Sequence, residues 1–206
     1  MIVSLIYSLR LINNKNIPHY MNGFYWYNVV GVLSLIPSNL YYFSDFSHAW
    51  AHAINNFSVV FHFSFLGSFI IRVMLLKSYF KYIVVTFSLF LVLIIYFLFS
   101  NNFTTSIEQL FSISCLGLTI LSLFYFHYIF KYSSHANLLK EPAFWIVTGI
   151  FISMSFIVPI SATIDYLRYR IPEFNFSIIS NLLLVGYIIM HIFFIKGFII
   201  SKRKIY

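Results

Sequence analysis

Charged residues are scarce in this chain. They make up 9% of its 206 residues, and only five of them are acids, whereas a soluble domain carries roughly 25% charged residues. Cysteine occurs once, at Cys115 within an apolar run, so no disulfide forms within the chain. Glycine occurs only seven times, which makes the small-residue seams of closely packed transporter helices sparse. The composition therefore excludes a soluble kinase, ATPase or nucleic-acid-binding module, and bulky phenylalanine and isoleucine packing is expected.

Signatures of catalysis and conduction are also missing. There is no G-x-S-x-G, no H-E-x-x-H, no Walker loop and no pair of glutamates within an apolar run. The arginine ladder of voltage sensors and the carbonyl-filter signature of channels do not occur either. These absences favour a non-enzymatic protein, although an enzyme or channel built on another motif stays open.

Long apolar runs dominate what is present. Hydrophobic residues make up 61% of the chain, and its mean hydropathy is +0.88. About 20 apolar residues in a helix cross a hydrocarbon core of about 30 Å. The sequence therefore predicts an all-α fold, a polytopic transmembrane helix bundle that forms a single integral membrane domain over residues 1–206. The six full spans are predicted at 23–43, 55–76, 82–100, 107–130, 143–165 and 177–199.

The N-terminal segment, residues 1–12, is apolar but too short to cross a bilayer. It has neither a charged n-region nor a small-residue cleavage site, so it does not resemble a signal peptide. Two interpretations stay open: an interfacial half-helix, or the end of a longer span that begins before Met1. The second is favoured because residues 7–12 resemble the emerging end of a helix. With this segment the bundle has seven helices.

Lysine and arginine are concentrated in every second gap between the apolar runs. Eleven of the thirteen cations fall on one predicted side of the membrane, and only Arg168 and Arg170 fall on the other. Because cytoplasmic loops are enriched in Lys and Arg, the rich side is expected to be cytoplasmic. The prediction is a multi-pass protein of the cytoplasmic (inner) membrane with a cytoplasmic C-terminus. This topology explains the net charge of +8, so no nucleic-acid partner is expected.

A divalent metal site is the sharpest local hypothesis. Asp45, His48 and His52 have the spacing D-x-x-H-x-x-x-H, which places the three residues on one side of a helix. Two imidazoles one turn apart and a carboxylate are suitable ligands for Zn²⁺ or another divalent transition metal. The alternative is a polar interfacial helix in which Trp50 is a membrane anchor.

A second candidate site lies in the outward-facing third of the predicted bundle, where prolines at positions 37 and 159 interrupt two spans. Polar residues within spans are costly and mark either a ligand or proton site or hydrogen bonds between helices. Both interpretations stay open here. The candidate ligand or proton residues are Asn39, His62, Asp165 and Asn181.

Haem and retinal fit the sequence poorly. His127 and His191 lie near the inner ends of their spans, at depths that differ by about five residues or roughly 7.5 Å, which does not suit paired axial ligands. Lys196 lies at the inner boundary, away from the mid-membrane position of a buried Schiff base.

The stretch Pro142–Gly149 has the pattern P-x-F-W-I-x-x-G and follows a basic, leucine-containing loop. It resembles uncharacterised bacterial integral membrane proteins with seven predicted spans. It is also similar to the membrane sensor portions of some bacterial sensor histidine kinases. The resemblance implies a seven-helix membrane domain that works with a histidine-kinase-like partner, and it implies no particular site residues. The chain departs from that group in its short first segment and in lacking a C-terminal signalling domain, so the kinase partner would be a separate protein.

The leading functional hypothesis is a non-enzymatic sensory, signalling or accessory protein with an outward-facing polar site. A ligand or membrane state detected there would shift the two proline-containing helices, and the basic loops and tail would pass the shift to a membrane or cytoplasmic partner. The first alternative is a small-solute or ion transporter or channel that uses His62, Asp165 and Asn181. The second is a membrane metalloenzyme built on the D-x-x-H-x-x-x-H residues. The oligomeric state does not follow from the sequence.

Overall fold

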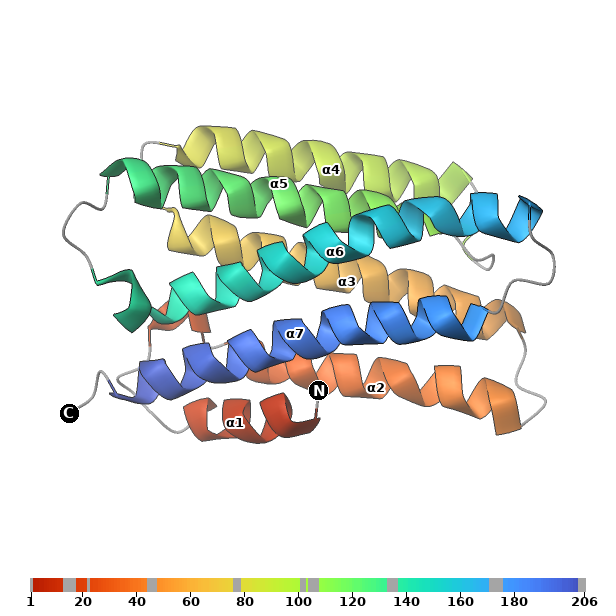
Figure 1. Ribbon diagram of the computed structural model, residues 1–206, viewed down its shortest axis with the longest axis horizontal. Coiled ribbons are helices and arrows are strands. Elements are labelled where there is room, and N and C mark those ends of the chain that lie inside the picture. Colours follow the sequence, from red (N-terminus) through yellow and green to blue (C-terminus); the bar gives the residue numbers. More distant parts are fainter. Residues whose placement is uncertain are drawn as a thin grey trace.

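The computed structural model describes residues 2–12, 18–21, 23–43, 48–75, 79–100, 103, 108–132, 137–170 and 176–203. These residues form seven α-helices and two short 3-10 helices, with no strand among them (Figure 1). The predicted all-α helix bundle is confirmed. In chain order the elements are α1 (Ile2–Ile12), η1 (His19–Met21), α2 (Phe24–Phe43), α3 (His48–Val73), α4 (Phe80–Ser100), α5 (Glu108–Tyr132), η2 (Leu138–Lys140), α6 (Pro142–Arg170) and α7 (Phe176–Arg203).

Five of the six predicted spans correspond to helices, α3 to α7, that are long and apolar enough to cross a membrane, judged by length and composition. The remaining one, 23–43, corresponds to α2, which does not meet this criterion over the residues that the structure describes. The most apolar of the five is α4, with a mean hydropathy of 2.7 over its span. Its outer surface exposes large apolar side chains such as Val92, which is 65% exposed, and Phe99, which is 78% exposed. A continuous apolar surface of this kind is suited to lipid rather than to water. The chain is therefore a multi-pass membrane protein.

Six helices form a ring, and α4 lies outside it. Around the ring α1 packs on α2, α2 on α3, α3 on α5, α5 on α6 and α6 on α7, and α7 returns to α1, while α4 packs on α3 and α5. Successive helices from α2 to α7 run in opposite directions, so the C-termini of α3, α5 and α7 share one end of the bundle with the N-termini of α2, α4 and α6 (Figure 1). We call this the cationic end because it carries Arg72, Lys81, Lys131, Lys140 and Lys196.

Aromatic side chains fill the space that α2, α3 and α7 enclose. Phe24 of α2 is fully buried at the centre of this aromatic core. Its ring contacts Phe65 and Phe69 of α3 and Phe194 and Phe198 of α7, with ring centroids 5.0–5.5 Å apart. All four contacts are edge-to-face, the arrangement that aromatic quadrupoles favour, and such pairs contribute about 0.5–1.5 kcal/mol each beyond their buried area. Bulky packing of the expected kind therefore joins these three helices.

One helix pair, α6 and α7, nevertheless packs through glycine. A Cβ atom at Gly149 of α6 would lie 2.6 Å from the Cβ of Phe193 and 3.2 Å from the backbone oxygen of Met190. A Cβ atom at Gly197 of α7 would lie 3.1 Å from the backbone oxygen of Pro142. The absence of side chains at these positions lets the two backbones approach closely. As a result, α6 and α7 share the most extensive interface in the bundle, although the chain has few glycines.

Helices α3 and α6 extend furthest beyond the predicted spans. Helix α3 begins at His48 rather than at residue 55, and α6 continues to Arg170 rather than ending at 165. Hydropathy marks the part of a helix that lies in hydrocarbon, whereas backbone hydrogen bonding can continue the helix into the interface. The added turns of α3 contain Ala49, Ala51 and Ala53, and alanine has the highest helix propensity. Most of residues 44–54, which separate the first two predicted spans, is therefore helical.

The N-terminal segment forms α1, a helix of 11 residues and therefore about 16 Å long. It packs against α2 and α7. Among the side chains of α1 that the structure describes, those of residues 2–9, the two that are completely buried are serines, Ser4 and Ser8. The hydroxyl groups of these serines need partners in such a position.

Candidate functional site

The predicted metal site lies only partly within the described residues. His48 and His52 both belong to α3, one turn apart as their spacing predicted, whereas Asp45 lies outside the described residues. The side chain of His48 also lies outside them, and His52 is half-buried. In the described part of the chain, no group of three His, Cys, Asp or Glu residues is placed to hold a metal ion. Metal binding by Asp45, His48 and His52 stays a prediction.

The four residues predicted to form an outward-facing polar site belong to four different helices. Asn181 is exposed on α7 and His62 is half-buried on α3. Asn39 belongs to α2 and Asp165 to α6, but the side chains of these two lie outside the described residues. A shared site formed by the four residues therefore stays a prediction.

His62 is oriented by its own helix. Its Nδ1 lies 2.9 Å from the backbone oxygen of Ser58, one turn earlier. A carbonyl oxygen only accepts hydrogen bonds, so Nδ1 carries the proton, and in the neutral ring Nε2 carries the lone pair. The imidazole also packs edge-on against Tyr27 of α2, with centroids 5.0 Å apart. His62 thus borders the aromatic core, and Nε2 is its remaining polar atom.

A buried polar cluster that the sequence analysis missed joins α1, α2 and α7. The Ser4 hydroxyl lies 2.8 Å from Asn28 Oδ1 and 3.0 Å from His191 Nδ1. Asn28 Nδ2 donates to the Phe24 backbone oxygen at 2.8 Å and to the Ser8 hydroxyl at 3.4 Å. Ser4, Ser8 and Asn28 are fully buried, and His191 is 6% exposed. We call Ser4, Ser8, Asn28 and His191 the α1 clamp.

The hydrogen bonds of the α1 clamp have a defined direction. The Ser4 hydroxyl donates its single proton to Asn28, so the proton in its contact with His191 belongs to Nδ1 of the imidazole. Ser8 donates its proton to the Leu5 backbone oxygen at 2.8 Å and therefore accepts from Asn28. This chain of hydrogen bonds fixes α1 against α2 and α7 without the use of a full charge.

Aromatic residues surround a lysine at the cationic end. The Nζ of Lys131 donates to the hydroxyl of Tyr79 at 3.4 Å and lies 5.3 Å from the ring centre of Tyr132. The Tyr79 hydroxyl also lies 3.3 Å from His127 Nε2. Tyrosines that flank a lysine are typical of a membrane–water interface. His127 therefore belongs to this interfacial cluster, whereas His191 belongs to the α1 clamp.

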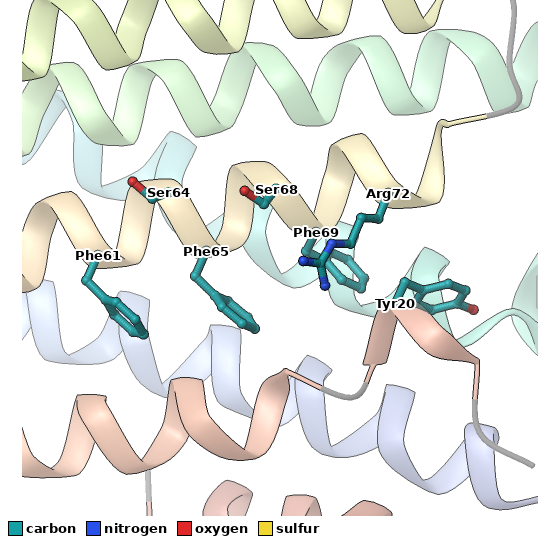
Figure 2. Close-up of a pocket in the computed structure, with 7 residues that line it drawn as sticks. All are labelled: Tyr20, Phe61, Ser64, Phe65, Ser68, Phe69 and Arg72. Carbon is teal, nitrogen blue, oxygen red and sulfur yellow. The ribbon is translucent and has the colours of Figure 1, made fainter. Parts of the chain in front are cut away.

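A pocket of about 250 Å³ lies along α3 at the cationic end (Figure 2). Two rows of α3 residues line this α3 pocket, and the residues of each row recur at every fourth position, so that they lie one above another on the helix. Tyr20 of η1 lies beside Arg72 at one end of the pocket (Figure 2). The aromatic row consists of Phe61, Phe65 and Phe69, and the polar row consists of Ser64, Ser68 and Arg72.

Comparisons with known proteins yield no relative. No family model, curated protein or solved structure matches this chain. The resemblance of Pro142–Gly149 to bacterial membrane sensors stays an expectation. The function must therefore be inferred from the arrangement of the bundle and its surfaces.

Proposed function

We propose that this chain is a non-enzymatic sensory, signalling or accessory membrane protein. The observation that carries the proposal is the aromatic core, in which Phe24 and four surrounding rings occupy the space between α2, α3 and α7. A transporter or channel needs a path lined by polar groups or backbone oxygens. Close-packed rings in this position support a closed bundle instead. The protein then acts through its ends and its lipid-facing surfaces.

The cationic end is the proposed cytoplasmic face. Lys81, Lys131 and Lys140 are exposed there, together with Arg72 near the end of α3. The enrichment of Lys and Arg in cytoplasmic segments supports this orientation, with the C-terminus in the cytoplasm and the bundle in the inner membrane. Exposed cations at a membrane surface attract acidic protein segments and anionic lipid headgroups. This end is therefore the proposed output surface.

Helix α6 is the proposed moving element. Pro159 lies in its interior, and a proline removes one backbone hydrogen bond and bends a helix. Helix α6 packs on both α5 and α7, and its N-terminus follows η2 at the cationic end. A change in the angle at Pro159 would therefore move the surface around Lys140.

The proposed partner is a separate histidine-kinase-like protein in the membrane or cytoplasm. The resemblance of Pro142–Gly149 to sensor portions of such kinases supports this partner. So does the position of this stretch, because α6 begins at Pro142 on the proposed output surface.

The C-terminal tail provides the test. Deleting the gene in its own host is expected to change a defined set of transcripts, and expressing the full chain is expected to restore them. A chain without residues 200–206 should reach the membrane at the same level and fail to restore them. The matched control, Arg168→Gln with Arg170→Gln, removes cations from the opposite end and should restore them. Full restoration by the truncated chain contradicts output through the cationic end.

A further inference from the structure

The α3 pocket presents serine hydroxyls that have no hydrogen-bond partner among the described residues. Some serines of the bundle bond to a backbone oxygen one turn earlier, as Ser114 does to Leu110 at 2.7 Å and Ser122 to Leu118 at 2.8 Å. Others, Ser153, Ser155 and Ser201, have buried hydroxyls without a partner among the described residues. The hydroxyls of the polar row make no such bond in the described part of the chain. Both serines of the polar row are half-buried, and their hydroxyls line the pocket. They can therefore donate to an occupant that carries hydrogen-bond acceptors.

The cationic end of the pocket is suited to an anionic group. Arg72 is exposed one residue before the end of α3, and no described carboxylate forms an ion pair with it. Its guanidinium group can bind a phosphate through two parallel N–H bonds. Burial, and to a lesser extent the negative charge of Glu141, raise the pKa of Tyr20 from its ordinary value near 10 to about 12. The Tyr20 phenol therefore stays protonated and can donate a hydrogen bond beside Arg72.

The rest of the pocket is suited to a hydrocarbon chain. The aromatic row extends from Phe61 to Phe69, which is about 12 Å along the helix axis at 1.5 Å per residue. Phe65 and Phe69 also contact Phe24, so one wall of the pocket is part of the aromatic core. The pocket is thus cationic at the membrane surface, and deeper in the bundle one of its walls is aromatic while Ser64 lies on the other row.

We propose that the α3 pocket binds one anionic phospholipid. Its phosphate contacts Arg72 and Tyr20, and one acyl chain lies along the aromatic row. Ser68 is four residues from Arg72, or about 6 Å along the axis, where it can donate to the ester oxygens that follow a lipid phosphate. Phosphatidylglycerol has the required charge and acceptors, whereas phosphatidylcholine of the same chain length lacks the net charge.

This inference names the ligand class of the proposed sensory protein. The effect of the lipid on signalling rests on the proposed function, whereas lipid binding to the α3 pocket does not. A chain bound along the aromatic row would bear directly on Phe65 and Phe69, and through them on Phe24 at the centre of the aromatic core. Lipid composition would then alter the packing of α2, α3 and α7 at the cationic end.

Lipid binding to the purified full chain tests the proposal. The protein in neutral detergent is titrated with phosphatidylglycerol or phosphatidylcholine, and native mass spectrometry counts the bound lipids. One cation near an anionic headgroup accounts for about a fivefold change in affinity. We therefore expect Arg72→Gln to weaken phosphatidylglycerol binding about fivefold and to weaken phosphatidylcholine less, because choline already offsets the charge of its phosphate. Ser68→Trp, which fills the pocket but keeps the charge, should weaken both lipids.

The matched control is Lys81→Gln, which removes an exposed cation from α4 at the same end but outside the pocket. It should leave both affinities unchanged. Equal losses in Arg72→Gln and Lys81→Gln would overturn the proposal in favour of diffuse surface charge. Full competition by glycerol phosphate would indicate a soluble anion instead, and a dimer that Ser68→Trp dissociates would indicate a second copy of the chain. Either result overturns the lipid assignment.

The lipid test and the tail-deletion test fail independently. Lipid binding is measured without a partner, so a chain that lacks residues 200–206 should still bind phosphatidylglycerol. Loss of lipid selectivity in Arg72→Gln with intact transcript restoration would refute lipid as the sensed ligand but keep the output surface.

Discussion

Replacing Asn28 with leucine should loosen α1 from the bundle. Asn28 is fully buried, and its amide bonds to Ser4, Ser8 and the backbone oxygen of Phe24. Leucine is similar in size but makes no hydrogen bond. In the variant the Ser4 hydroxyl loses Asn28 Oδ1 and the Ser8 hydroxyl loses a donor, while Ser4 keeps its contact with His191 and Ser8 keeps its bond to the Leu5 backbone oxygen.

The expected cost follows from these contacts. Hydrogen bonds between membrane helices contribute about 0.6 kcal/mol on average and at most about 1.7 kcal/mol. The Ser4–Asn28 bond is short at 2.8 Å, whereas the Asn28–Ser8 contact is weak at 3.4 Å. A buried polar group that loses all its partners costs about 1–3 kcal/mol; Ser4 and Ser8 each keep one, so the loss falls in the lower part of this range, and new apolar contacts of leucine offset some of it. We therefore expect Asn28→Leu to lower the free energy of unfolding by about 1–2 kcal/mol.

Equilibrium unfolding in mixed micelles with increasing SDS, followed by tryptophan fluorescence, measures this loss. The matched control is Asn181→Leu on α7, where the asparagine is exposed and the change should stay within about 0.5 kcal/mol. A double-mutant cycle isolates the shared bond. Because Ser4→Ala and Asn28→Leu remove the same interaction, their separate costs should exceed the cost of the double variant by about 0.5 kcal/mol or more.

Local opening of α1 provides a second readout. A cysteine introduced as Leu5→Cys, a half-buried position of α1 whose side chain is outside the clamp, reports opening in a Cys115→Ser background by its rate of maleimide labelling. A loss of 1.4 kcal/mol confined to α1 corresponds to about tenfold faster labelling in Asn28→Leu. Three results together would contradict this account: Asn28→Leu as stable as Asn181→Leu, an additive double-mutant cycle, and an unchanged labelling rate. The α1 clamp would then not be what holds α1 in the bundle.

Three further experiments test other parts of the bundle. Gly149→Leu should lower the free energy of unfolding by about 1–3 kcal/mol, because its Cβ would lie 2.6 Å from Phe193, whereas Ser88→Leu on the exposed face of α4 should not. The raised pKa of Tyr20 means that the fold favours the neutral phenol, so its contribution to stability is complete below pH 10 and is lost as the pH rises towards 12. In unfolding titrations Tyr20→Phe should lack this component of the pH dependence. Cys115 is 2% exposed and should react with maleimide only after unfolding; rapid labelling of the folded protein would contradict its placement.

The helices were largely predictable because hydropathy is a local property. About 20 apolar residues suffice to predict a span wherever they occur. Hydropathy could not place the start of α3 at His48. The alanine-containing turns that follow His48 are helical because alanine favours a helix, but they are less apolar than the predicted span that begins at residue 55. The seam at Gly149 was also missed, since a low glycine count does not reveal which glycines face another helix.

The α1 clamp could not be predicted because its members are distant in the sequence. Ser4 and Asn28 are 24 residues apart, and Ser4 and His191 are 187 residues apart. Serine and asparagine are common residues, and no periodic pattern connects them. From the sequence, His191 was considered only as a haem ligand, and no second histidine lay at a matching depth.

The α3 pocket, in contrast, left a signal in the sequence. Phenylalanines recur at every fourth position from Phe61 to Phe69, and a parallel row of two serines ends at Arg72. These rows show that one helix face is aromatic on one side and polar on the other. They do not show whether a neighbouring helix covers that face, which the arrangement of η1, α2 and α3 decides.

Flux through the reconstituted protein tests the closed bundle most directly. Proteoliposomes that contain the full chain and a pH-sensitive dye are given a potassium gradient and valinomycin, and proton and ion movement is compared with protein-free liposomes. The aromatic core around Phe24 predicts no flux above that background. Flux that exceeds the background and disappears in His62→Ala would contradict the closed bundle and assign the protein to transport.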